Sequence, residues 1–212
     1  MGMSSFYQRS GSAPSIRAPA EDLCLDFTNT LSWRGSAAPA EALGGPPELL
    51  AWLARSGQQT SPAAGTVADW PQRHPKRAAR LFAEAIALRE TIFRCCFAVA
   101  SGEPVAEADF AALNRALADA PSRQRLTRNN PGFAWGVERE PPSAAVLLAP
   151  VLWSAADLLT RTDRLRVRRC ANDACLWLFI DRSKTGSRRW CDMASCGNRA
   201  KAQRHYLRTR QG

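Results

Sequence analysis

Apolar residues recur at intervals of three and four along the segment 76–100, and this spacing predicts the longest helix of the chain. The stripe consists of Ala78, Leu81, Ala85, Leu88, Ile92, Cys95 and Val99. A second apolar stripe runs beside it and consists of Phe82, Ile86, Phe93 and Phe97. Because two neighbouring faces have to be covered, we expect this helix to lie at the centre of the fold.

Other helices are predicted by the same spacing together with proline and glycine at their ends. They cover residues 49–57, 105–120, 145–159 and 196–210. The segment 145–159 is apolar nearly all round, so it should be buried against the long helix. Pro150 lies inside it and should kink this helix or divide it in two.

Alternating apolar positions predict short strands between these helices. Residues 123–128 and 133–137 flank the turn-forming sequence Asn-Asn-Pro-Gly and predict a β-hairpin. Residues 165–168 and 176–180 predict two more strands, and residues 23–27 predict a strand or extended segment that turns into a helix. The expected fold class is therefore α+β, mainly α, with a small hairpin in a helical N-terminal domain.

Charge is distributed unevenly along the 212 residues. Residues 1–160 contain 15 basic and 15 acidic side chains, whereas residues 161–212 contain 14 basic and 4 acidic ones, so the entire net charge of +10 lies in the last quarter. We expect a neutral domain over 1–163 and a basic domain over 164–212 that meets a polyanion or an anionic surface. The alternative is a solvated surface in an arginine-rich protein, which explains the preference for arginine over lysine but not the clustering.

Several classes of protein are disfavoured by the sequence. No apolar stretch reaches the length of about 18 residues that a membrane span needs, and the first residues do not resemble a secretory signal, so we expect a cytoplasmic protein without membrane contact. The chain has two histidines and no Walker A loop, dinucleotide-binding glycine motif, zinc-protease motif or nucleophile elbow. The sequence therefore does not predict an enzyme.

The seven cysteines fall into two groups. Cys170 and Cys175, then Cys191 and Cys196, form two C-x4-C pairs separated by fifteen residues. An odd total disfavours a disulfide framework, and paired thiolates suit a tetrahedral, structural zinc ion, although four buried or redox-active cysteines remain an alternative. Cysteine loop, hairpin and helix follow one another in the order of a treble-clef zinc finger. The other group, Cys24, Cys95 and Cys96, lies in apolar sequence, and we expect Cys95 to be an inert core residue.

The C-terminal sequence resembles the CGNR zinc finger family. Residues 196–199 spell the four letters of that name, and the similarity extends from Cys170 to Lys201. Upstream, Leu23–Leu31 resembles the leading motif of the ABATE domain, which commonly precedes this finger. The resemblance implies a bacterial, stress-induced transcription regulator whose finger contacts DNA.

Six basic residues and one asparagine of the finger are the candidates for DNA contact. They are Arg188, Arg189, Asn198, Arg199, Lys201, Arg204 and Arg208. On the last helix we expect a separate face, formed by Cys196, Ala200, Gln203 and Leu207, to meet the zinc site and the core. In the alternative interpretation some of these arginines, such as Arg188 or Arg199, pack on tryptophan rings.

A rival function belongs to another class of protein. In this hypothesis the N-terminal domain binds a small-molecule effector, and the finger is a structural or protein-docking module. Asp26, Asn29 and Thr30 form the one polar cluster embedded in apolar sequence and are the candidate ligand pocket. Helix caps and turn hydrogen bonds are the commoner role of such residues. A homodimer is compatible with either function.

Overall fold

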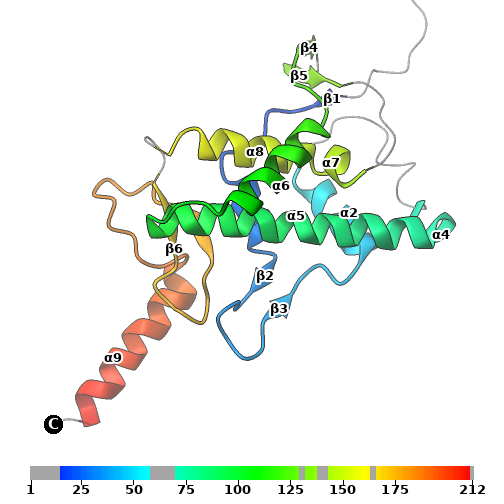
Figure 1. Ribbon diagram of the computed structural model, residues 1–212. Helices are drawn as coiled ribbons and strands as arrows, with labels where there is room; N and C mark the ends of the chain where they lie inside the picture. The colour runs from blue at the N-terminus through cyan, green and yellow to red at the C-terminus, as the bar shows by residue number, and fades with distance from the viewer. Residues whose placement is uncertain (1–14, 58–69, 129–131, 138–142, 163–165, 211–212) are drawn as a thin grey trace, which may run out of the picture.

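A single long helix, α5 (Pro75–Ser101), passes through the middle of the molecule and the other elements gather around it (Figure 1). The computed structural model describes residues 15–57, 70–128, 132–137, 143–162 and 166–210. Helix α5 has Pro75 in its first turn and ends at Gly102, whose φ of 72° is a left-handed conformation that glycine adopts without strain. The predicted central helix is thus confirmed.

Shorter helices pack around α5 in the main body of the molecule. They are α1 (Leu23–Thr28), α2 (Pro46–Arg55), α4 (Trp70–Arg73), α6 (Glu107–Ala118), α7 (Ala144–Leu147) and α8 (Ala149–Leu159). The predicted division at Pro150 is confirmed, because α7 ends at Leu147 and Pro150 occupies the first turn of α8. Proline is accepted there because the first helical N–H groups have no acceptor within the helix.

The segment around α1 differs from the sequence-based expectation. Residues 23–27 form a helix and not a strand, because this short turn is surrounded by α5 and α8 and buries nearly every side chain. A fully enclosed helix of six residues shows no 3.6-residue periodicity, so its apolar pattern resembles that of a strand. Its backbone is anchored by the Cys24 N–H, which donates to the Ser154 Oγ of α8 at 3.1 Å.

Three small antiparallel sheets complete the part of the fold that the structure describes. The first has the strand order β1 (Ser15–Ile16), β5 (Phe133–Gly136), β4 (Arg125–Arg128), and the others pair β2 (Leu31–Ser32) with β3 (Ala40–Glu41) and β6 (Val167–Arg169) with β7 (Leu178–Ile180). The predicted β4–β5 hairpin is confirmed, with Arg128 opposite Phe133; three residues of its predicted turn, 129–131, lie outside the described residues. The sheets confirm a mainly helical α+β fold.

The main hydrophobic core extends beyond the helical body into the C-terminal region. Its buried members come from α1, α2, α5, α6, α7 and α8, and also include Val167, Leu178 and Ile180 of the β6–β7 hairpin. This hairpin packs on α1 and α5. The domain boundary expected after residue 163 falls outside the described residues. The described parts on either side of it share one core.

The last helix leaves the body of the molecule. A π-helical turn, η1 (Met193–Gly197), continues directly into α9 (Asn198–Arg210), which projects away from every other helix (Figure 1). Gln203 is exposed, so the expectation that it faces the core is wrong. The physical reason is that the body ends at the base of α9, and η1 is its main contact.

Candidate metal centre and nucleic-acid surface

Four cysteines from distant parts of the C-terminal region converge on one point. Cys170 follows β6 and Cys175 closes the short loop after it, where the Cys175 N–H donates to the Asn172 carbonyl at 2.8 Å. Cys191 precedes η1, and Cys196 lies within it. The four Sγ atoms all lie within 4.8 Å of one another. Cys191 is half-buried, and the other three are buried.

The geometry of this cluster fits a zinc ion. In a tetrahedral site with Zn–S bonds of about 2.3 Å, neighbouring sulfurs are about 3.8 Å apart. The Sγ atoms of Cys175 and Cys191 are separated by 3.7 Å. The surroundings also fit, because the Asn172 Nδ2 lies 3.7 Å from the Cys196 Sγ and can donate to a thiolate. The Trp177 Nε1, buried against the cluster, has no acceptor among the described residues.

Electrostatics explain why the cluster needs a cation. A hydrogen bond from Cys191 lowers the pKa of Cys170 to about 5. Burial, together with the nearby Cys170 charge, raises the pKa of Cys175 to about 12. The hydrogen bond to Cys170 and burial also raise the pKa of Cys191 far above its ordinary value. Cys175 and Cys191 therefore resist ionisation without a metal ion, whereas one bound Zn²⁺ would supply positive charge that favours their thiolates.

The path from the metal site to α9 is fixed by hydrogen bonds to its backbone. The Asp192 carboxylate accepts from the N–H groups of Ala194 and Ser195 and caps η1. The Gly197 N–H donates to the Asp192 carbonyl at 3.0 Å, and the Asn198 Nδ2 donates to the Ala194 carbonyl at 3.2 Å. Asn198 thus stabilises the start of α9, the structural role that its sequence position also allowed.

Three of the predicted DNA-contacting arginines lie over aromatic rings of the protein. The guanidinium carbons of Arg188, Arg189 and Arg199 are 4.4 Å from the Phe179 ring, 5.5 Å from the Trp190 ring and 4.5 Å from the Trp33 ring. Arg188 also donates to the carbonyls of Trp190 and Cys191. Cation–π packing therefore involves more of the finger's arginines than the one or two expected from the sequence.

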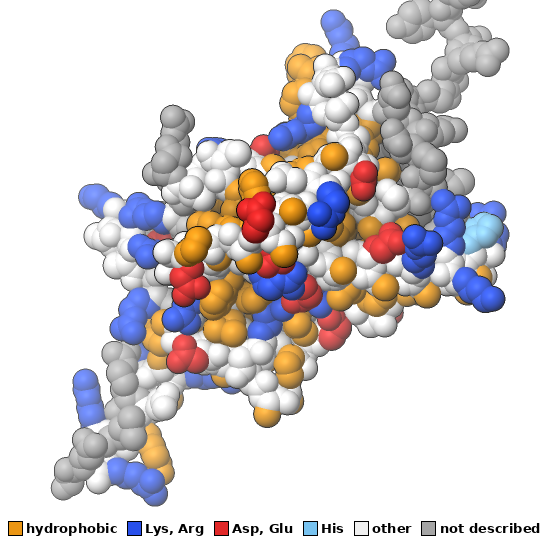
Figure 2. Space-filling view, in the orientation of Figure 1, with side chains coloured by type: hydrophobic (Ala, Val, Ile, Leu, Met, Phe, Trp, Pro, Cys, Tyr) orange, Lys and Arg blue, Asp and Glu red, His pale blue; other side chains and the backbone are white. Residues whose placement is uncertain are grey.

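The cations further along α9 face solvent. Lys201, Arg208 and Arg210 are exposed, and Figure 2 shows basic side chains over the finger and along the projecting helix. The Arg204 side chain lies outside the described residues. Arg210 lies over the ring of Tyr206 at 4.8 Å, and that ring is itself half-exposed. The outer part of α9 therefore presents basic side chains that are open to a partner.

The predicted ligand pocket is occupied by structural contacts. Asn29 bonds the Leu178 backbone twice, donating to its carbonyl at 2.9 Å and accepting from its N–H at 3.1 Å. The Thr30 hydroxyl donates to the Phe27 carbonyl and accepts from Arg89. Asp26 is exposed. Asn29 and Thr30 join the end of α1 to the zinc finger and to α5, which corresponds to the structural role weighed from the sequence.

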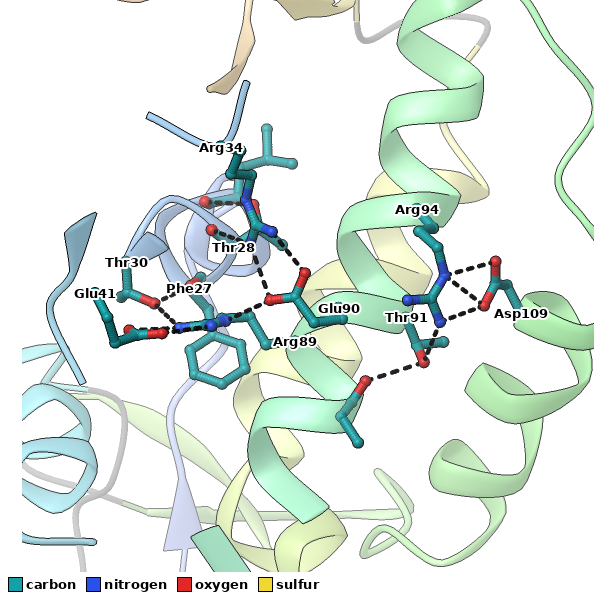
Figure 3. Close-up of polar contacts among 12 residues, drawn as sticks. Phe27, Thr28, Thr30, Arg34, Glu41, Arg89, Glu90, Thr91, Arg94 and Asp109 are labelled. Carbon is teal, nitrogen blue, oxygen red and sulfur yellow. Dashed lines mark hydrogen bonds and ion pairs between the residues drawn. The ribbon is translucent and has the colours of Figure 1, made fainter. Parts of the chain in front are cut away.

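Sequence reasoning missed a charged network that supports this region (Figure 3). Arg89 of α5 is only 2% exposed and bonds both carboxylate oxygens of Glu41 at 2.7 Å. Arg34 bonds both oxygens of Glu90, at 2.6 and 3.1 Å. The one available signal was the adjacent arginine and glutamate of α5, which lie between the apolar stripes of a central helix. No sequence pattern indicated their partners, because these lie about fifty residues away.

Together, the fold and the cysteine cluster define a zinc-finger protein with a mainly helical N-terminal domain. Residues 21–162 match the ABATE family model, described as "Putative stress-induced transcription regulator", and residues 166–209 match the CGNR zinc finger model. The chain belongs to the ABATE family and carries a CGNR zinc finger with one zinc site. Both resemblances seen in the sequence are confirmed. The family description is that of a transcription regulator and not of an enzyme.

Two further comparisons complete the description. A search of curated proteins finds no match to this chain. Among the described residues, no helix combines the length and the apolar character that crossing a membrane requires.

Proposed function

We propose that the protein is a cytoplasmic, DNA-binding transcription regulator whose helix α9 contacts the phosphate backbone of DNA. The observation that carries this proposal is the exposure of α9, a helix of 13 residues that leaves the body and bears solvent-facing cations along its length. A basic helix that projects into solvent is suited to a polyanion. The family description supports regulation of transcription as its purpose.

Because residues at the base of α9 contact other parts of the protein, we propose that residues further along the helix contact DNA. Asn198 and Arg199 lie at the base of the helix and are engaged with Ala194 and Trp33, so we assign them to holding α9 in place. Lys201 and Arg208, with Arg204 and Arg210, are the proposed phosphate contacts. Phosphate contacts of this kind determine affinity and orientation more than sequence preference.

The salt dependence of DNA binding tests this assignment. If four or five phosphates are neutralised, log K should fall against log salt with a slope of about −4, measured by fluorescence anisotropy with full-length, zinc-loaded protein and a mixed-sequence duplex. The double variant Lys201→Ala/Arg208→Ala should flatten the slope by about 2. The matched control Lys76→Ala/Arg80→Ala removes two exposed cations from the far end of α5 and should leave the slope unchanged.

Two results would contradict the proposal. One is the absence of DNA binding at low salt, and the other is an equal effect of the α9 and α5 variants. Either result would favour the docking function, in which the finger serves contacts within the protein. That alternative is supported by Arg182 of the finger, which bonds Asp22 at 2.9 Å and Glu21 at 3.4 Å in the N-terminal domain.

The small-molecule alternative has one supporting observation. A cavity of about 710 Å³ lies between α5, α6 and α7, lined by Leu88, Ala112, Ala116 and Val146 among others, whereas Asp26, Asn29 and Thr30 do not line it. Thermal unfolding of the protein with a panel of small metabolites tests this alternative. A stabilising compound whose effect disappears in Ala112→Trp, which fills the cavity, would support it.

A further inference from the structure

The loop between β2 and β3 contacts the cysteine loop of the zinc finger directly. The Gly35 N–H donates to the Ala174 carbonyl at 3.2 Å, between the two ligands Cys170 and Cys175. A Cβ atom at Gly35 would lie 1.9 Å from the Asp173 carbonyl oxygen, so no side chain fits at this position. The N-terminal domain and the finger therefore meet here backbone against backbone.

Trp33 continues this contact from the cysteine loop to the base of α9. Its ring packs against the cluster formed by Cys170, Cys175 and Cys196, and the Arg199 guanidinium lies above it at 4.5 Å. Trp33 has a φ of 56°, a conformation that a bulky residue rarely adopts and that persists only where the surroundings enforce it. One aromatic ring of the N-terminal domain is thus placed between the metal site and the first turn of α9.

The loop is held in turn by the charged network on α5. The Arg34 side chain is 8% exposed, and it bonds Glu90 twice and the Thr28 carbonyl at 2.9 Å (Figure 3). Its guanidinium carbon also lies 4.0 Å from the centre of the Phe93 ring. Glu90 also accepts from Arg89, which anchors Glu41 of β3 at the other end of the loop. Two arginines and two glutamates balance in charge and fix both ends of the loop to one helix.

We propose that the segment 33–36 is a positioning element for the zinc finger, through which the N-terminal domain sets zinc retention and the direction of α9. Trp33 and Gly35 hold the cysteine loop and the base of α9, and Arg34 transmits the position of α5 to both. Groups that support metal ligands from outside the coordination shell commonly change metal affinity by about 10–100-fold when altered. The part concerning α9 rests on the proposed function, whereas the part concerning zinc does not.

A pair of glycine variants tests the contact with the cysteine loop. Gly35→Ala introduces a Cβ into the Asp173 carbonyl, whereas the matched control Gly44→Ala meets nothing within 4 Å. We expect zinc transfer from full-length Gly35→Ala to a chromophoric chelator to be about 10-fold faster than from the wild type or Gly44→Ala. Equal rates for Gly35→Ala and the wild type would overturn the proposal.

A second pair keeps the test informative if Gly35→Ala does not fold. Glu90→Gln weakens the hold on Arg34 without touching the finger, and Glu84→Gln removes a carboxylate from the same helix that pairs only with the exposed Arg80 among the described residues. We expect faster zinc transfer from Glu90→Gln and wild-type transfer from Glu84→Gln. Unchanged transfer from Glu90→Gln, with far-UV circular dichroism showing a folded protein, would contradict transmission through Arg34.

DNA binding separates the two proposals. If α9 binds DNA and the loop positions it, Gly35→Ala at saturating zinc should weaken DNA binding while keeping the salt slope of the wild type, because the cations remain present. If no variant binds DNA but Gly35→Ala still loses zinc faster, the proposed function fails and the positioning of the finger stands. If DNA binding follows Lys201 and Arg208 but zinc transfer ignores Gly35, the positioning proposal alone fails.

Discussion

Arg89 shows how a single buried charge organises the N-terminal domain. It is the largest of the fully buried side chains among the described residues, and it donates to Glu41, Glu90 and Thr30. A buried guanidinium is tolerated only when carboxylates satisfy its charge and its N–H groups. Here its partners come from β3, from the turn between α1 and β2, and from α5 itself. One side chain thus joins three parts of the N-terminal domain.

We predict that Arg89→Met lowers the free energy of unfolding by about 3 kcal/mol, because it leaves Glu41 and Thr30 without their buried partner. Urea denaturation followed by circular dichroism measures this loss. The control Arg80→Met changes a side chain on the same helix that is 83% exposed and should cost less than about 0.5 kcal/mol. A similar loss for both variants would show that the network contributes no more than a surface pair.

The cysteines of the core should be inert in the folded protein. Burial, followed by the nearby Asp109 charge, raises the pKa of Cys95 to about 11, and a hydrogen bond that the Cys96 thiol donates to Cys24, together with burial, raises the pKa of Cys96. Little thiolate is then present at neutral pH, and labelling of Cys95 and Cys96 by a maleimide should be slow until the protein unfolds. Mass spectrometry of tryptic peptides measures this, and rapid native labelling of either residue would identify a reactive thiol.

At the scale of elements, the sequence predicts those whose apolar pattern is long enough to show a period. Helix α5 and the α7–α8 break at Pro150 are recovered because each follows from a local rule of spacing or backbone chemistry. Helix α1 is misassigned because burial on all sides removes the period. Strand β1 is missed because two residues, Ser15 and Ile16, pair with a strand more than a hundred positions away.

The contact between α1 and α8 can be tested through Ser154. Its hydroxyl accepts from the buried Cys24 N–H and donates to the Ala20 carbonyl at 3.1 Å. Ser154→Ala should therefore cost about 1–3 kcal/mol in unfolding free energy, since a buried N–H is left without an acceptor. Thr160→Ala, at the exposed end of α8, is the control and should change the urea midpoint little. A neutral Ser154→Ala would mean that the N–H finds another acceptor.

For the candidate site, too, features that depend on neighbouring residues in the sequence could be predicted, whereas contacts between distant residues could not. The zinc ligands were predictable because their spacing along the chain encodes a loop geometry. The status of Arg188 and Arg199 was not predictable in detail, because the rings that they cover belong to β7 and to a loop 166 positions earlier. Trp33 and Gly35 carry no motif, and only the folded contact with the finger reveals what they do.

At the scale of the whole molecule, the ABATE region and the zinc finger share one hydrophobic core. Asn29 pairs with the Leu178 backbone as an additional strand residue would, and Val167 and Ile180 complete the core around α5. Helix α9 projects away from this unit (Figure 1). We therefore expect the stability of the zinc finger to depend on the N-terminal domain, because the two share this core.

Acid should weaken this unit in a defined range. Burial opposes ionisation of Glu90, but hydrogen bonds from Arg34 and Arg89 outweigh it and lower the pKa of Glu90 below its ordinary value of 4.5. A carboxyl with a lowered pKa stabilises the fold fully above 4.5, and the stabilisation is lost as pH falls through the lowered pKa. We expect the urea concentration at the unfolding midpoint to decrease as the pH is lowered from 4.5. This decrease should be less steep for Glu90→Gln than for Glu84→Gln. Identical pH profiles for both variants would contradict a role for Glu90.

Because η1 continues directly into α9, the directions of the α9 cations around the helix axis are linked to the position of the zinc site. Because the helix is continuous from Cys196 to Arg210, the direction in which each cation points around the helix axis depends on its position in the sequence, and it changes by about 100° per residue along α9. Lys201 and Arg208 are seven positions apart and point within about 20° of each other. One alanine inserted after Gly197 would swing both together by about 100°, whereas one inserted after Ala202 would swing Arg208 away from Lys201. Only the second insertion should flatten the salt slope of DNA binding, because it places Lys201 and Arg208 on different sides of the helix.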